Sequence, residues 1–122
     1  MAPIRAEVRH FQEAVANVYD DGHLRVEHDN YYVACAGEAL RFRRAEFLLL
    51  SRLALGTGRI VKAEELWRHA WGEGRPYNAE SLHVHVYRLR GKLAPFGVRI
   101  ETLARVGYRL VPAPELPERR PA

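Results

Sequence analysis

Residues 81–93, SLHVHVYRLRGKL, constrain the fold more than any other stretch of the sequence. Leu82, Val86, Leu89 and Leu93 follow one another at steps of four, three and four, which places all four on one side of an α-helix. The other sides carry histidine, tyrosine and arginine. The pattern predicts a helix that packs on a core through one stripe and presents the rest of its surface to solvent or to a partner.

A second helical pattern covers residues 4–18, where apolar residues recur at steps of four, three, four and three. These residues are Ile4, Val8, Phe11, Val15 and Val18. We predict a helix here, followed by a turn at YDDGH (19–23). Three roles stay open for its narrow apolar stripe: packing on its own domain, dimerisation, or a link to a further segment.

Residues 23–43 consist of short stretches rich in β-branched and aromatic residues. LRVEHD, YYVACA and ALRFR are candidate strands, and the DN and GE pairs between them suit tight turns. We predict a small antiparallel sheet of about three strands. The single cysteine, Cys35, lies in the middle stretch, so we expect a small core residue rather than a reactive thiol.

Three helices and a hairpin complete the predicted order of elements. The helices cover residues 45–55, 61–72 and 79–93, and the hairpin covers residues 98–111. A pair of helices with a short connection, followed at once by a β-hairpin, is the layout of a winged helix-turn-helix domain of the α+β class. Gly91 is costly inside the third helix, and we expect it to leave room for the close approach of a strand.

The length and composition suit one compact core, because the chain has 122 residues and is 48% hydrophobic. We predict three parts: an amphipathic helix at residues 1–20, a winged-helix domain at residues 21–112 and a disordered Pro-rich tail at residues 113–122. No apolar run is long enough to span a membrane, and the start of the chain lacks the apolar core of a secretory signal. We therefore expect a cytoplasmic protein.

The net charge of +4 is distributed unevenly along the chain. Residues 1–40 hold three Arg or Lys against seven Asp or Glu, a balance of −4, whereas residues 41–122 hold sixteen against eight, a balance of +8. A basic surface of this kind suits the phosphates of a nucleic acid. A solvated helix face is the alternative interpretation of the same cations.

Metal binding and catalysis are not indicated. His83 and His85 are two residues apart, so they point in different directions on a helix, whereas metal-binding pairs on a helix are three or four apart. The sequence shows no nucleophile–base arrangement, no phosphate-cradling Gly-rich loop and no paired carboxylates. We therefore expect no enzyme activity, no metal and no cofactor.

Several motifs together resemble the OmpR/PhoB-type winged-helix DNA-binding domain. They are LRFRRAEFLLLSRLALGTGRIVKAEELWRHAWG, then SLHVHVYRLRGKL, then ETLARVGYRLV, and the preceding HLRVEHDNYYVACAGEALRF fits the four-stranded N-terminal sheet of that family. The resemblance covers about residues 22–111 and depends on several motifs in the right order.

The resemblance implies a bacterial-type transcription regulator of the two-component kind. It implies that the third helix enters the major groove of double-stranded DNA while the hairpin, called the wing, reaches the neighbouring minor groove. The loop from Gly72 to Asn78 corresponds to a place where RNA polymerase is often contacted, and relatives bind direct repeats as head-to-tail dimers. Family members that are response regulators carry a receiver domain ahead of this one, for which this chain has no room. The chain is expected to be a stand-alone regulator or the DNA-binding half of one.

Individual residues carry over by position. The residues that match places where relatives touch bases or phosphates are His85, Tyr87, Arg88 and Arg90. Val84 matches a place that packs on thymine methyl groups and Thr102 matches a wing threonine. By their charge or their place on the outer face of the helix or in the wing, further candidates for DNA contacts are His83, Lys92, Arg105 and Arg109. His85 also lies at the rim of the buried stripe, so a structural histidine is the alternative there.

Four positions depart from the family pattern. Glu80 stands where relatives often carry arginine, so its carboxylate would repel phosphate or accept a hydrogen bond from cytosine. Tyr87 replaces a frequent arginine, and Ala104-Arg105 replaces the usual Arg-Gly in the wing. Arg43 occupies the usual Thr cap position before the first of the three helices, where it should cap less well.

Two functions from different classes follow. The first is a sequence-specific DNA-binding transcription regulator. The second is a winged-helix protein–protein interaction module that has lost DNA binding, which Glu80, Ala104 and the acidic N-terminal third favour. Homodimerisation, on direct repeats or through the N-terminal helix, is compatible with either.

Overall fold

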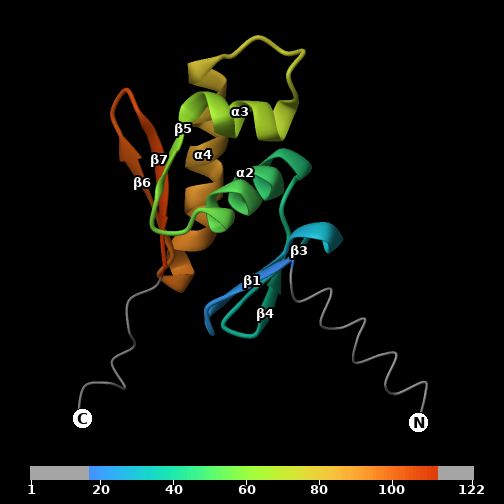
Figure 1. The fold of residues 1–122 in the computed structure, drawn as a ribbon. Coiled ribbons are helices and arrows are strands. Elements are labelled where there is room, and N and C mark those ends of the chain that lie inside the picture. The colour runs from blue at the N-terminus through green and yellow to red at the C-terminus, as the bar shows by residue number, and fades with distance from the viewer. Residues whose placement is uncertain (1–16, 113–122) are drawn as a thin grey trace. The chain divides into compact units, whose positions relative to one another are not determined.

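The computed structural model describes residues 17–112. The chain divides into two compact units, and the boundary between them falls between Arg41 and Phe42. The architecture is α+β, with an antiparallel sheet first, then helices and a C-terminal β-hairpin, as the sequence predicts (Figure 1). Within residues 17–112, no helix is both long and apolar enough to cross a membrane.

The first unit contains a four-stranded antiparallel sheet in the order β1-β2-β3-β4. Its elements are β1 (Val18–Asp20), β2 (Leu24–Glu27), the short 3-10 helix η1 (His28–Asn30), β3 (Tyr32–Cys35) and β4 (Glu38–Leu40). Leu24 and Val26 are buried while Arg25 and Glu27 are half-exposed, which is the alternation of a sheet with one covered face. Cys35 is also buried, and burial raises the pKa of its thiol to about 11. Cys35 is therefore a core residue with a protonated thiol, as expected.

Strand β1 corrects the prediction for the start of the chain. Its residues fall where the sequence predicted the last turn of a helix and the turn after it. Tyr19 pairs with Val26 and Asp20 with Arg25, and the Asp20 carboxylate lies 2.8 Å from the Arg25 guanidinium. These partners are close in sequence, but Val18 continues the apolar spacing of residues 4–18, so that spacing predicts a helix where a strand begins. Most of the predicted helix at 4–18, and the tail at 113–122, lie outside the described residues.

The second unit has three helices and a three-stranded sheet in the order β5-β7-β6. Its elements are α2 (Arg44–Leu55), β5 (Ile60–Lys62), α3 (Ala63–Trp71), α4 (Ala79–Leu93), the 3-10 helix η2 (Ala94–Phe96), β6 (Arg99–Leu103) and β7 (Gly107–Val111). Figure 1 shows the β6–β7 hairpin, drawn in red-orange, beside α4. Buried side chains from all three helices and from the sheet form the core of the unit, among them Leu50, Leu66, Leu89 and Leu110.

The sequence does not predict strand β5, because Val61 and Lys62 fall at the start of the second predicted helix. It pairs with β7, with Lys62 opposite Gly107. The approach is so close that a Cβ added to Gly107 would lie 2.0 Å from the carbonyl oxygen of Val61. Gly107 is therefore required by the contact between the hairpin and β5.

Helix α2 begins with an incomplete cap, as predicted for Arg43. The Arg43 side chain makes no cap hydrogen bond, since a guanidinium has no acceptor for the free N–H groups of the first turn. Glu46 supplies the reciprocal half of a capping box, because its Oε1 accepts a hydrogen bond from the Arg43 backbone N–H at 3.0 Å.

Candidate nucleic-acid interface

Helix α4 is held in the unit by its predicted stripe. Leu82, Val86, Leu89 and Leu93 are all buried, at most 1% exposed. The helix begins at Ala79 behind the cap residue Asn78, whose Oδ1 accepts a hydrogen bond from the Ser81 N–H at 2.9 Å. Burial on one side and a defined start fix which residues of α4 point away from the protein.

The residues opposite the buried stripe form what we call the outward stripe: Glu80, Val84, Tyr87 and Gly91. They repeat at steps of four, three and four, offset by two residues from the buried stripe. Two residues turn a helix by about 200°, so the two stripes lie on opposite sides. Val84 is 40% exposed and Tyr87 is 67% exposed. No cation belongs to this stripe.

Gly91 corrects one prediction. It is exposed, and a Cβ added to it would meet nothing within 4 Å. No strand of residues 17–112 approaches it, in contrast to Gly107. Its open position instead leaves the outward stripe bare near the C-terminal end of α4.

Two of the predicted contact residues flank the outward stripe. Arg88 lies on one side and His83 on the other, the side of the wing, and both are exposed. Within residues 17–112, the Arg88 side chain has no hydrogen-bond or ion-pair partner. Arg88 is therefore available to an external acceptor.

Arg90 is bound to the wing. Its Nε donates a hydrogen bond to the backbone carbonyl oxygen of Ile100 at 2.9 Å, and one of its terminal nitrogens donates to Thr102 Oγ1 at 2.8 Å. Both acceptors belong to β6. Arg90 thus ties α4 to the wing, and it occupies the acceptor side of the Thr102 hydroxyl.

Lys92 is bound to α2 on the opposite side of the helix. Its ammonium lies 2.7 Å from Glu46 Oε1 and 5.4 Å from the centre of the Phe42 ring. Glu46 is only 2% exposed. Burial alone would raise the pKa of Glu46, but hydrogen bonds from Lys92 and the Arg43 backbone outweigh it and hold the pKa below its usual value. The Lys92 ammonium therefore compensates the negative charge of the buried Glu46 carboxylate.

Arg109 is paired within the wing sheet. It stands opposite Glu101 in the β6–β7 register, and its Nε donates to Glu101 Oε1 at 2.9 Å. Both side chains are about one-third exposed (36% and 37%), so the pair contributes about 0.5 kcal/mol to stability. The pairing nevertheless offsets the charge that Arg109 would present to a phosphate.

Arg105 stands at the tip of the wing, in the turn between β6 and β7. Its φ of +67° lies in the left-handed region, which favours glycine and costs other residues about 1 kcal/mol. The side chain is exposed and has no hydrogen-bond or ion-pair partner elsewhere in 17–112. Arg105 therefore combines a positive charge with an unfavourable backbone conformation, at a position where the family that the sequence resembles usually has glycine.

His85 packs against the protein rather than outward. Its Nδ1 lies 2.8 Å from the Ser81 carbonyl oxygen, and its ring meets the edge of Trp71 at a centroid distance of 4.9 Å. Trp71 stacks on Trp67, whose indole N–H donates to the Arg75 carbonyl oxygen at 3.0 Å. This aromatic cluster anchors the 72–78 loop and favours the structural interpretation of His85. No group of three or more potential metal ligands occurs within 17–112.

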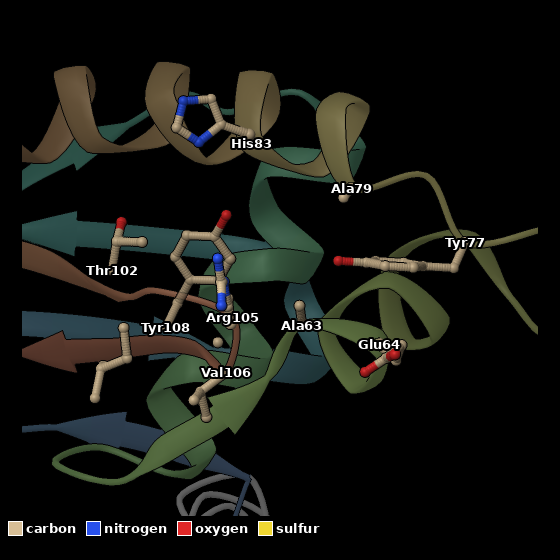
Figure 2. A pocket seen from close by; sticks show the side chains of 11 residues that line it. Ala63, Glu64, Tyr77, Ala79, His83, Thr102, Arg105, Val106 and Tyr108 are labelled. Carbon is tan, nitrogen blue, oxygen red and sulfur yellow. The ribbon is translucent and has the colours of Figure 1, made fainter.

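A pocket of about 390 Å³ lies between α4, the start of α3 and the wing, and it was not foreseen (Figure 2). His83, Thr102 and Arg105 line it together with Tyr77 and Tyr108. Figure 2 shows Tyr77 entering from the loop before α4, and Tyr108 entering from the wing. The wall also includes Glu64, an acceptor among these donors.

Tyr108 is the most informative residue of the pocket. It is only 7% exposed, yet its hydroxyl has no hydrogen-bond partner in 17–112 and is not closed off from solvent. Burial raises the pKa of Tyr108, and it likewise raises the pKa of Tyr77, which Glu64 raises further. Both hydroxyls stay protonated at neutral pH and can donate hydrogen bonds. In the sequence, Tyr108 was only part of a family motif, and no spacing rule marked its hydroxyl as free.

Comparison with known proteins identifies the family. The family model for "Transcriptional regulatory protein, C terminal" matches residues 37–110. Response regulator ArlR of Staphylococcus haemolyticus is 32% identical over 109 residues, which is 88% of this chain and 49% of ArlR. The RstA DNA-binding domain of Klebsiella pneumoniae, solved in complex with the RstA box, is 30% identical with a TM-score of 0.66, covering 78% of this chain and 97% of that domain.

A second solved structure agrees. The DNA-binding domain of CpxR from E. coli is 25% identical with a TM-score of 0.67, covering 79% of this chain and 97% of that domain. The chain therefore belongs to the family of OmpR/PhoB-type DNA-binding domains of transcription regulators. It spans about half the length of ArlR.

Proposed function

We propose that the chain is the DNA-binding part of a sequence-specific transcription regulator. In this proposal α4 lies in the major groove and the β6–β7 wing reaches the neighbouring minor groove. The observation that carries the proposal is that α4 is fixed in place while part of its surface has no partner. One side of the helix is buried, and Arg90 and Lys92 connect it to β6 and to α2. Arg88 and the outward stripe have no hydrogen-bond or ion-pair partner within residues 17–112. A rigid helix with uncommitted polar side chains suits groove recognition.

The proposed phosphate contacts are Arg88 and Arg105. Both are exposed cations with no partner in the described part of the chain, and they stand on α4 and at the wing tip. The pocket between these elements offers donors from His83, Tyr77 and Tyr108, which suits one backbone phosphate. Glu64 opposes an anion there, so the phosphate would sit nearer α4 and the wing.

The proposed base contacts come from the outward stripe. Val84 and Tyr87 are its exposed apolar and amphipathic members. A valine methyl can pack on a thymine methyl, and a tyrosine hydroxyl can donate or accept at a base edge.

The remaining candidates are proposed as positioning residues. Arg90 and Thr102 connect α4 with the wing, Lys92 neutralises Glu46, and Arg109 pairs with Glu101. His85 supports the aromatic cluster under the 72–78 loop. Their replacement would act on the placement of the helix and wing rather than on a DNA contact.

The proposed partners beyond DNA follow from the family. A second copy would bind the neighbouring half-site of a direct repeat, or pair through the N-terminal segment. The 72–78 loop is exposed throughout and is held by Trp67, so it could present a surface to RNA polymerase.

A protein-interaction module is the alternative. Glu80 stands at the N-terminal end of the outward stripe and no cation belongs to that stripe, so the same surface with Val84 and Tyr87 would suit a protein partner.

Selection of bound duplexes from a randomised DNA pool tests the proposal. A regulator of this kind should enrich a repeated motif with half-site centres about ten base pairs apart. A pool that comes through without enrichment would contradict sequence-specific binding and favour the interaction module. A steep fall of DNA affinity with rising salt concentration would indicate phosphate contacts, whereas the affinity for a protein partner held by apolar contacts should change little with salt.

A further inference from the structure

Glu80 is the charged member of the outward stripe, and its carboxylate is not neutralised by the protein. It is exposed, and no hydrogen bond or ion pair joins it to another side chain of residues 17–112. Its neighbours one turn further along α4 are His83 and Val84, so no Lys or Arg lies beside it on the helix. The two cations at the far end, Arg90 and Lys92, are bound to β6 and to Glu46.

An uncompensated carboxylate is unfavourable against DNA unless a donor meets it. An ionised carboxylate only accepts hydrogen bonds. In the major groove guanine offers acceptors at N7 and O6, and thymine offers O4 and a methyl group, so neither can satisfy it. Adenine offers an amino group with the acceptor N7 beside it, whereas cytosine offers its N4 amino group without an acceptor of its own.

We propose that Glu80 is a specificity-determining residue that accepts a hydrogen bond from the N4 amino group of a cytosine. This inference rests on the proposed function, because it requires α4 to lie in the major groove. The stripe geometry supports it, since Glu80 shares one line with the exposed Val84 and Tyr87. The same carboxylate repels phosphates and the hydrogen-bond acceptors on the edges of other bases, so it selects against those bases as well as for cytosine.

A purely structural role for Glu80 is the competing explanation. Glu80 lies in the first turn of α4, where a negative charge interacts favourably with the helix dipole. That role would make the Glu80→Gln variant slightly less stable and leave its base preferences unchanged. Base preference therefore distinguishes the two roles, and thermal unfolding measures the structural one separately.

The experiment compares the bases enriched from a randomised duplex pool by the wild type and by Glu80→Gln, Glu80→Ala and Glu73→Gln. We expect the wild type to enrich cytosine at one position of each half-site. Glu80→Gln should shift that position toward adenine, because glutamine can bind adenine N6 and N7 together. Glu80→Ala should lose the preference there and bind unrelated sequences more tightly. Glu73→Gln makes the same charge change in the exposed 72–78 loop and should keep the wild-type motif.

Affinities on single duplexes give the second readout. Replacing the selected cytosine by thymine should weaken wild-type binding by about tenfold or more, and should change the binding of Glu80→Ala by far less. Enrichment of one motif, with the same bases at every position for the wild type and Glu80→Gln, would overturn this inference and leave the proposed function standing. A pool without any enriched motif would instead contradict the proposed function itself.

Discussion

Two regions of α4 differ in whether their polar groups are already satisfied. On the two flanks of the buried stripe, Arg90 donates to β6 and Lys92, on the opposite flank, is paired with the buried Glu46. On the open side, Arg88 and the outward stripe have no partner in the described residues. All three cations looked equivalent in the sequence. The partner that each cation reaches within the protein, rather than its charge, decides whether it is available to DNA.

The largest effect is expected at Gly107, where the wing packs against β5. The Gly107→Ala Cβ would lie 2.0 Å from the Val61 carbonyl oxygen, so β5 and β7 would have to separate. We expect the free energy of unfolding to fall by about 3 kcal/mol, the upper range for overpacking. Urea unfolding measures it, and an unchanged midpoint would show that the contact between β5 and the wing is loose.

Lys92→Met should lower the free energy of unfolding by about 2 kcal/mol at pH 7, because it leaves the Glu46 carboxylate buried without its ammonium partner. The pKa of Glu46 lies below its ordinary value of 4.5 in the folded protein. The stability from this pair is therefore present above pH 4.5 and is lost as the pH falls through the lowered value.

The difference between the wild type and Lys92→Met should therefore shrink as the pH falls below 4.5, because Glu46 is protonated first in the unfolded chain and then, at the lowered pKa, in the folded protein. Thermal unfolding at a series of pH values measures it. A difference that stays constant across this range would mean that Lys92 stabilises only through its packing on Phe42.

Arg105→Gly, at the tip of the wing, should change the free energy of unfolding and the affinity for DNA in opposite directions. Removing the side chain relieves a φ of +67°, so the free energy of unfolding should rise by about 0.5–1 kcal/mol. The same change removes a proposed phosphate contact, and affinity for DNA should fall. Chemical denaturation and fluorescence anisotropy on one duplex measure the two quantities. If both fall together, Arg105 supports the wing rather than DNA.

Gly91→Ala should give the smallest effect, a gain of at most about 1 kcal/mol from helix propensity. No atom of the described part of the chain lies within 4 Å of the added Cβ, so no packing cost offsets the gain there. A loss of stability in thermal unfolding would show that a part of the chain beyond residues 17–112 covers this face. Gly91→Ala is also the matched control for Gly107→Ala.

The sequence predicted the parts of the fold that depend on local pattern. The buried stripe of α4 and the three helices follow from apolar spacing, and the poor cap at Arg43 follows from residue type. Strand β5 and the need for glycine at 107 depend on pairing between residues that are distant in sequence, which a single sequence does not display. Strand β1 pairs with the neighbouring β2, but the apolar spacing of residues 4–18 extends into it and indicates a helix instead.

The candidate site was predictable only as a set of residues. Resemblance and charge selected Arg88, Arg90, Lys92, Arg105 and Arg109 together. They differ in whether another residue of the protein already binds each cation. The partner of Lys92 is Glu46, 46 positions away in the sequence. The free hydroxyl of the buried Tyr108 depends in the same way on how α3, α4 and the wing meet.

The most direct test of this account is the salt dependence of binding to one duplex, measured for the wild type, Arg88→Gln and Arg109→Gln. Each phosphate contact contributes about 0.9 to the slope of log affinity against log salt. We predict a slope smaller by about 0.9 for Arg88→Gln and an unchanged slope for Arg109→Gln, since Arg109 is already paired with Glu101. An equal loss of slope in both variants would contradict the distinction between free and committed cations.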